Sequence, residues 1–535
     1  MSKKKSNSFV KGAAILGIAA VVIKLMGAFF RIPLGNMIGD MGMSYYQSAY
    51  PIYNYLLVIS TAGIPTAIAK IISEKIALGD HLGADKVLKT SLSMMLIVGS
   101  IFALSLVIFS GNIVSYVKNP NAIYSILAIT PAIFFVSLMS VYRGYFQGYQ
   151  HMEMYAWSQV VEQFVRVSVG FFLAYILLSK GVEFSAAGAT FGATIGAIFG
   201  SIVIIYMFRN FKKKTNFDIT DKFREETSGE ILKNLFKIAI PITLGASILP
   251  IMTIFDLAIV MRRLTSVGYT VVEANRLYGQ LTGYAQTVVN LPQVVTSAVQ
   301  ISIVPAISRF AALKDDFKRN QTIEVGLRLA VIIGLPSSVG LALLSGGIMR
   351  LLYPYQIEIA SNIGAILGIL GFGVVFLSIF QITTGILQGL GRQKLPALNL
   401  FYGAILKLIL SYTLVGIRVL NIKGAAIATV SAYGLAALLN FVSMAKVSKL
   451  KINYEKLFFR PLVDVFAMSV VIEIIKFIVS PFSDRLATLL AVFLGGFTYL
   501  VMLFVTKTIS DEELKIVPGG LKLKEIGNFV NSWRK

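Results

Sequence analysis

Residues 143–148 read Arg-Gly-Tyr-Phe-Gln-Gly, and residues 384–389 read Thr-Gly-Ile-Leu-Gln-Gly. The two glycines and the glutamine match at a constant offset of 241 residues. Three further pairs keep this offset: Phe135 and Phe376, Ser137 and Ser378, and the cations Arg166 and Lys407. The pattern predicts an internal repeat, which is a strong indicator of architecture.

A second block of matches supports the repeat at a slightly different offset. Ile-Ser followed by Ala-Leu-x-Asp occurs in residues 72–80 and again in residues 307–315. Each copy covers six expected membrane spans, an even number, so both copies enter the membrane in the same direction. We therefore expect two pseudo-symmetric six-helix lobes, an arrangement typical of alternating-access transporters.

The composition predicts a membrane protein. Hydrophobic residues make up 56% of the 535 residues and charged residues only 14%, whereas soluble domains carry roughly 25% charged residues. Apolar runs long enough to cross a bilayer recur throughout the chain. We expect an all-α polytopic fold with about fourteen spans, near residues 12–35, 45–72, 90–112, 121–142, 154–178, 185–208, 234–260, 275–306, 324–345, 358–387, 397–417, 421–445, 461–481 and 485–507.

The basic residues predict the orientation. The chain has 49 Lys and Arg against 26 Asp and Glu, a net charge of +23, and the cations are concentrated in loops, which argues against nucleic-acid binding. The positive-inside rule places both termini in the cytoplasm. The expected organisation is an N-lobe (1–208), a basic linker (209–233), a C-lobe (234–445), two further spans (446–507) and an amphipathic tail (508–535).

Several kinds of chemistry lack the residues they need. The chain has no cysteine and two histidines, which leaves no thiolate metal site or cysteine nucleophile. Zinc-hydrolase and nucleotide-binding motifs are also missing from the sequence. We expect no cofactor and no catalysed reaction.

Charged residues inside the expected spans point to a binding site, because a charge at the bilayer centre costs at least about 2.5–3.5 kcal/mol. Five cations fall in or at the ends of spans: Lys24, Arg31, Arg166, Arg276 and Lys407. Acids are fewer. Glu162 lies one helical turn before Arg166, which predicts an ion pair, and Asp256 lies in the seventh span.

An excess of cations favours an anionic substrate, because phosphate oxygens form charge-assisted hydrogen bonds with them. A cavity for cationic drugs would instead need buried carboxylates. Arg31 and Arg276 could alternatively extend to the outer interface without binding anything.

Two further patterns have structural interpretations. Gly188, Gly192, Gly196 and Gly200 predict a close helix-packing face. The tyrosines at positions 45, 46, 50 and 53 are interpreted as an interfacial aromatic belt.

Three motifs resemble a known family. They are Lys-Leu-Met-Gly-Ala-Phe-Phe-Arg-Ile-Pro at residues 24–33, Tyr-Gln-x-x-Tyr-Pro-x-Tyr at 46–53, and Arg-Gly-x-x-Gln-Gly at 143–148 with Ser-Gln-Val-Val-Glu-Gln-x-x-Arg at 158–166. They resemble the polysaccharide-biosynthesis, stage V sporulation protein B-like branch of the multidrug/oligosaccharidyl-lipid/polysaccharide flippase superfamily. That branch includes the MurJ-type lipid II flippases of Gram-positive bacteria.

The resemblance implies an inward-open cavity for a pyrophosphate-sugar headgroup, with the prenyl tail left in lipid. It places essential cavity cations at Lys24, Arg31 and Arg276. It also implies a sodium site at Asp256 and Asn399, with Thr429 as a further ligand, so that Na⁺ or H⁺ could drive transport.

We therefore predict a monomeric flippase in the cytoplasmic membrane that moves an undecaprenyl-pyrophosphate-linked precursor, lipid II above all, to the outer leaflet. Its expected partners are membrane lipid, this substrate and the cell-wall synthesis machinery. The alternatives are export of another polysaccharide lipid intermediate, a multidrug antiporter, a membrane-embedded glycosyltransferase and a non-transporting scaffold. Short external loops disfavour the glycosyltransferase, and the cationic spans disfavour the multidrug antiporter.

Overall fold

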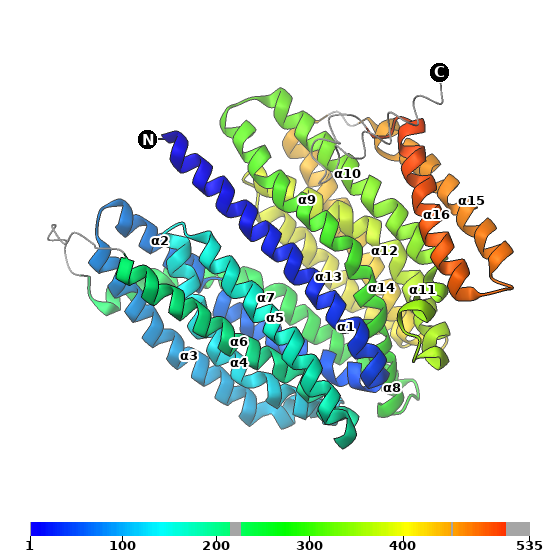
Figure 1. Cartoon of the computed structure of the whole chain (residues 1–535), viewed down its shortest axis with the longest axis horizontal. Coiled ribbons are helices and arrows are strands. Elements are labelled where there is room, and N and C mark those ends of the chain that lie inside the picture. The colour runs from blue at the N-terminus through cyan, green and yellow to red at the C-terminus, as the bar shows by residue number, and fades with distance from the viewer. Residues whose placement is uncertain (1, 215–225, 451–452, 510–535) are drawn as a thin grey trace. The chain divides into compact units, whose positions relative to one another are not determined.

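The computed structural model of the chain describes residues 2–214, 226–450 and 453–509, and these contain helices but no strand (Figure 1). The first helices are α1 (Ser2–Thr61), α2 (Ile64–Ala77), α3 (His81–Tyr116), α4 (Ile123–Gly148), α5 (Met152–Leu177), α6 (Val182–Lys214), α7 (Ser228–Ser266) and α8 (Val271–Gly279). A π-helical turn, Gln280–Ala285, leads into α9 (Gln286–Ala312). The chain continues through α10 (Asp316–Leu343), α11 (Ser345–Leu352), α12 (Ile357–Gly389), α13 (Lys394–Val415), α14 (Asn421–Ser448), α15 (Arg460–Val479) and α16 (Asp484–Val505).

The first two spans differ from their predicted boundaries. Helix α1 runs through the expected loop and is interrupted only at Gly39, whose φ of 67° and ψ of −176° are non-helical. The next break falls at residues 62–63, inside the expected second span. Gly63 is needed there because a Cβ atom would lie 2.2 Å from the Ala239 carbonyl oxygen of α7. Helix α2 then starts at Ile64, with Pro65 in its first turn.

The helices are long and apolar enough to cross a membrane. Twelve candidate spans occur in the described residues, and the first of them runs 63 residues from Ile15 to Ala77. At 1.5 Å per residue that length is about three times the thickness of the hydrocarbon core, so it supplies at least two crossings. Counting this first candidate as two crossings brings the twelve candidates to thirteen crossings. Helix α15 has the length of one crossing, although it carries charged residues, and supplies the fourteenth expected span.

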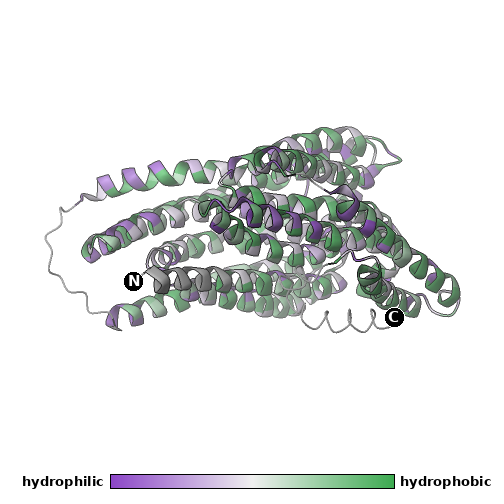
Figure 2. Cartoon of the chain, turned by 90° about the horizontal axis from the view of Figure 1, so that it is seen from above, coloured by the Kyte–Doolittle hydropathy of each residue, from purple (hydrophilic) through white to green (hydrophobic). Residues whose placement is uncertain are grey.

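The outward-facing surface of the helices suits lipid. Figure 2 shows hydrophobic residues along most of the length of the long helices. Large side chains are widely exposed, including Phe466 at 71% and Phe477 at 85% on α15. A water-soluble protein rarely exposes so much apolar surface. The predicted all-α polytopic membrane fold is therefore confirmed.

The chain divides into two compact units, residues 1–283 and 284–535. This division follows from the packing of the chain, whereas the lobes predicted from the sequence follow from the internal repeat. The predicted boundaries of the lobes therefore stay a prediction. The amphipathic tail expected at residues 508–535 lies outside the described residues from residue 510 onward.

The internal repeat reappears as the same local contacts in each unit. A Cβ atom on Gly99 of α3 would lie 2.9 Å from the Ser137 Cβ of α4, and one on Gly334 of α10 would lie 2.8 Å from the Ser378 Cβ of α12. A Cβ atom on Gly148 would lie 2.9 Å from the Ile72 Cβ. For Gly389 and Ile307 that distance is the same, 2.9 Å.

The helix caps repeat as well. The Asp80 carboxylate accepts a hydrogen bond from the Gly83 amide at 2.7 Å, and the Asp315 carboxylate accepts one from the Lys318 amide at 3.1 Å. Each aspartate is the N-cap of the helix that follows it, so the matched residues play matched structural roles.

The glycine face predicted for α6 is confirmed. A Cβ atom on Gly192 would lie 2.5 Å from both the Arg166 carbonyl oxygen and the Gly170 Cα of α5, and one on Gly196 would lie 2.6 Å from the Glu162 carbonyl oxygen. The backbones of α5 and α6 can approach this closely only because α6 has no side chain there. The face therefore sets the position of Glu162 and Arg166 in the fold.

Candidate functional site

The tyrosines of α1 line the interior of the first unit. Tyr45, Tyr46 and Tyr53 are at most 5% exposed, and Tyr50 is half-buried. The Tyr50 ring packs against the Tyr46 ring at a centroid distance of 4.8 Å and against the Tyr53 ring at 6.2 Å. The predicted aromatic belt is thus wrong: the spacing of three and four residues does define one helix face, but that face contacts protein.

Two arginines from different helices contact the Tyr50 ring. The Arg31 Cζ lies 5.9 Å from the ring centroid, and the Arg166 Cζ lies 5.1 Å from it. These separations are those of cation–π contacts. The Arg166 guanidinium also donates a hydrogen bond to the Tyr50 hydroxyl. Arg31 precedes the Gly39 kink and Tyr50 follows it, so the two segments of α1 and helix α5 together build one site. Its three residues are Arg31, Tyr50 and Arg166, and it is called the Tyr50 site below.

Glu162 pairs with a different arginine from the one the sequence predicted. The Arg143 Nη2 atom of α4 donates to the Glu162 Oε2 atom at 2.8 Å, and the Arg143 Nε atom donates to the Ser158 hydroxyl at 2.9 Å. Arg143 is only 8% exposed, and a cation buried to this extent needs a counter-charge. This corrects the expected Glu162–Arg166 pair, in which both residues lie on α5.

The Arg143–Glu162 pair changes the charge of the site. Arg143 already neutralises Glu162, and neither Arg31 nor Arg166 has a carboxylate partner among the described residues. Two cations therefore flank one tyrosine, and no carboxylate of the described residues forms an ion pair with either cation. Such an arrangement attracts an anion.

The other three predicted cations lie elsewhere. Lys24 is exposed on α1, and Arg276 is exposed on α8, within electrostatic range of Tyr45. Lys407 is half-buried on α13, in the second unit. The structure thus brings together Arg31 and Arg166 of the five. The role of Tyr50 was missed, although its motif was noted in the sequence.

Buried polar contacts fasten α1 to the segment that begins with α8. The Gln280 side chain donates to the Asp40 carboxylate at 2.9 Å, and the Gln47 side chain donates to the Thr282 carbonyl at 2.8 Å. The approach is close because a Cβ atom on Gly279 would lie 2.1 Å from the Asp40 carbonyl oxygen. These contacts hold in place the part of α1 that follows the Gly39 kink, and the position of Tyr50 depends on that part.

The residues proposed for a sodium site do not fit one ion. The Asn399 side chain donates to Asn440 at 2.8 Å and to Ser443 at 3.2 Å, both on α14. Thr429 lies eleven residues before Asn440 on that helix, about 16 Å along its axis, and its hydroxyl donates to the Ala425 carbonyl. Asn399 and Thr429 therefore cannot bind one ion together. The described residues also contain no group of three or more acids or histidines suited to a metal.

Asp256 remains a candidate on its own. It is 8% exposed on α7 and lies within electrostatic range of the buried Tyr278. A buried carboxylate in a membrane span is a suitable proton carrier.

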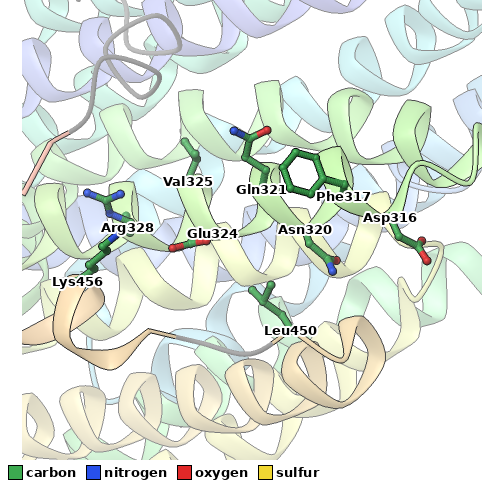
Figure 3. Close-up of a pocket in the computed structure, with 9 residues that line it drawn as sticks. All are labelled: Asp316, Phe317, Asn320, Gln321, Glu324, Val325, Arg328, Leu450 and Lys456. Carbon is green, nitrogen blue, oxygen red and sulfur yellow. The ribbon is translucent and has the colours of Figure 1, made fainter.

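A pocket of about 530 Å³ lies in the second unit, between the first turns of α10 and the segment leading to α15 (Figure 3). Its charged lining residues are Asp316, Glu324, Arg328 and Lys456. The two acids balance the two cations, so this pocket has no charge preference that matches the Tyr50 site.

The comparisons with known proteins agree with this fold. A family model described as polysaccharide biosynthesis protein matches residues 9–311, which is more than half of the chain. The chain belongs to the polysaccharide biosynthesis protein family. The MatE family model matches residues 281–413 of this family member.

Named relatives of this polysaccharide biosynthesis family member include flippases. It is 29% identical to stage V sporulation protein B of Bacillus subtilis over 96% of the chain and 98% of that relative. It is 27% identical to the lipid II flippase MurJ of the same organism over 82% of the chain and 83% of MurJ.

Solved structures confirm the fold of the family member. A lipid II flippase MurJ in an inward closed conformation matches with a TM-score of 0.70 at 16% identity, covering 92% of this chain and 98% of that one. An inward-facing MATE transporter matches with a TM-score of 0.65 at 17% identity, covering 80% and 96%. These likenesses show that the chain has the same membrane fold as the MurJ and MATE transporter structures.

Proposed function

We propose that this protein flips an undecaprenyl-pyrophosphate-linked cell-wall precursor, lipid II above all, from the inner to the outer leaflet of the cytoplasmic membrane. The observation that supports this function is the pair Arg31 and Arg166 on Tyr50, without a recorded carboxylate partner among the described residues. A pyrophosphate has oxygen atoms for both guanidinium groups, and each contact would be charge-assisted. The relative named lipid II flippase supports the choice of substrate.

A second candidate substrate is another polysaccharide lipid intermediate. It is supported by the 24% identity over 84% of the chain to a probable low-salt glycan biosynthesis flippase of Haloferax volcanii. Both substrates carry an anionic group between a lipid tail and sugars, so the Tyr50 site fits the part they share.

Reconstitution of the purified protein in vesicles tests the proposal. The vesicles carry a fluorescent lipid II in one arm, a polyprenyl-pyrophosphate bearing a different glycan in the second, and a fluorescent phosphatidylcholine in the third. A membrane-impermeant quencher then reports how much headgroup has changed leaflet. We expect movement in the first arm above that in empty vesicles and above the third arm. Equal movement in the first and third arms would contradict an anionic substrate site.

The orientation gives a separate prediction. The chain contains no cysteine, so single cysteines can be introduced and labelled. Val419 and Phe482, each 85% exposed, should become labelled from outside the cell. Ser228 and Leu313, also exposed, should be labelled only after permeabilisation. Labelling of Ser228→Cys in intact cells would contradict the proposed topology and indicate the opposite orientation in the membrane.

Coupling to an ion gradient makes a prediction about Asp256. The substitution Asp256→Asn keeps the size of the side chain but cannot carry a proton or a negative charge. We expect flipping in vesicles to lose its dependence on an imposed pH or sodium gradient, while the melting temperature changes little. A variant with the same gradient dependence as the wild type would leave Asp256 a structural residue.

A further inference from the structure

The Tyr50 hydroxyl has an incomplete set of hydrogen bonds. A phenol oxygen can accept two hydrogen bonds and donate one. Arginine can only donate, so the Arg166 contact uses one acceptor position of the Tyr50 oxygen. The Tyr46 hydroxyl lies 2.9 Å from the same oxygen and donates to it.

Burial explains the direction of the bond between the two tyrosines. Tyr46 is only 2% exposed, so its hydroxyl hydrogen needs an acceptor inside the protein. The Tyr50 oxygen is the acceptor recorded for it among the described residues. Tyr50 itself is half-buried and can present its hydrogen to a ligand. Both acceptor positions of Tyr50 are thus filled, and none of the described residues accepts the hydrogen of its own hydroxyl.

The position of this leftover donor is informative. It belongs to a ring that two guanidinium groups contact, Arg31 at 5.9 Å and Arg166 at 5.1 Å from the centroid. No acceptor for the Tyr50 hydrogen is recorded in the part of the chain that the structure describes. An acceptor that approached it would lie close to two positive charges, so an anionic oxygen is favoured over a neutral one.

We infer that Tyr50 is a direct substrate ligand, which donates its hydroxyl hydrogen to a phosphate oxygen of the headgroup between Arg31 and Arg166. This inference rests on the proposed function and names a donor within the same site. Tyr50 has two tasks. Its ring and oxygen hold the arginines, and its hydrogen adds a third, neutral donor for the phosphate.

The substitution Tyr50→Phe tests the inference because it removes the donated hydrogen, together with the oxygen that accepts from Arg166, and keeps the ring beneath both guanidinium groups. The measurement is the affinity of the solubilised protein for a polyprenyl pyrophosphate and for the corresponding polyprenyl alcohol. We expect the affinity for the pyrophosphate to fall about ten- to a hundredfold, the effect of one hydrogen bond to a charged group. The affinity for the alcohol should change much less. The ratio of the two affinities is measured on folded protein, so a change in stability does not affect it.

Tyr55→Phe is the matched control. It makes the same chemical change on the same helix, five residues and so about 140° around the helix axis from Tyr50, and should leave both affinities unchanged. A Tyr50→Phe variant that keeps the wild-type ratio would overturn the inference, and so would one that loses both affinities equally. Failure of the proposed function has a different signature, because the wild-type protein itself would then bind pyrophosphate no better than alcohol.

Discussion

Replacing Arg166 with glutamine should lower the flipping rate of a pyrophosphate-linked lipid by about one to two powers of ten. Arg166 and Arg31 each offer the headgroup a charge-assisted hydrogen bond worth about 1.5–3 kcal/mol, and 1.4 kcal/mol corresponds to a factor of ten. Arg31→Gln should act similarly. The two changes together should abolish support of wall synthesis in cells depleted of their own flippase.

Lys24→Ala should also weaken complementation, whereas Lys24→Arg keeps the charge and should be tolerated.

Arg262 supplies the matched control for these variants. It lies at the end of α7 and contacts the Tyr116 ring, with its Cζ 4.1 Å from the centroid. Arg262→Gln therefore removes the same charge and the same kind of cation–π contact away from the Tyr50 site. It should flip lipid at the wild-type rate. If Arg166→Gln and Arg31→Gln both performed as well as Arg262→Gln, the anion would bind elsewhere.

Gly192→Ala should destabilise the protein by about 1–3 kcal/mol, the effect typical of an added methyl group in a packed interior. The new Cβ would lie 2.5 Å from the Arg166 carbonyl oxygen and 2.5 Å from the Gly170 Cα, both backbone atoms that cannot rotate away. Helices α5 and α6 must then separate, which moves Arg166 relative to Tyr50. We expect a lower melting temperature together with slower flipping, even though the substituted residue contacts no substrate.

Gly111→Ala is the control for this substitution. Gly111 lies in α3, and apart from its chain neighbours and the backbone of its own helical turns, no atom of the described residues lies within 4 Å of where its Cβ would be. The same change there should be neutral or slightly stabilising, because alanine loses less conformational freedom in a helix than glycine. Equal losses of melting temperature at positions 192 and 111 would show that the close contact between α5 and α6 has no energetic importance.

The sequence was sufficient for the architecture because its signals are local or periodic. Apolar length predicts spans, the glycine spacing on α6 predicts a packing face, and the matched residues Ser137 and Ser378 predict a repeat. Each depends on the positions of residues along the chain alone. The structure confirms the all-helical fold, the glycine face and the repeated contacts.

The site was predicted only in part, because pairing depends on neighbours that are distant in sequence. Glu162 was assigned to Arg166 because both lie on one helix, and the competing Arg143 comes from α4. The tyrosines of α1 could not be placed either. In a membrane helix, the face toward lipid and the face toward protein can both be apolar, so periodicity identifies a face and not its environment. Asn399 and Thr429 were grouped by resemblance, without the axial distance along α14 that separates their surroundings.

The pairing of α4 with α5 also bears on how the chain is made. Glu162 and Arg166 both lie in the middle part of α5, and each charge costs about 2.5–3.5 kcal/mol at the centre of an isolated helix in lipid. Synthesis proceeds from the N-terminus, so Tyr50 and Arg143 already exist when α5 leaves the ribosome. An α4–α5 hairpin can neutralise Glu162 before that residue meets lipid, and the earlier α1 can receive Arg166. We therefore expect α5 to enter the bilayer together with the helices that precede it, so that the order of translation itself helps to insert its charges.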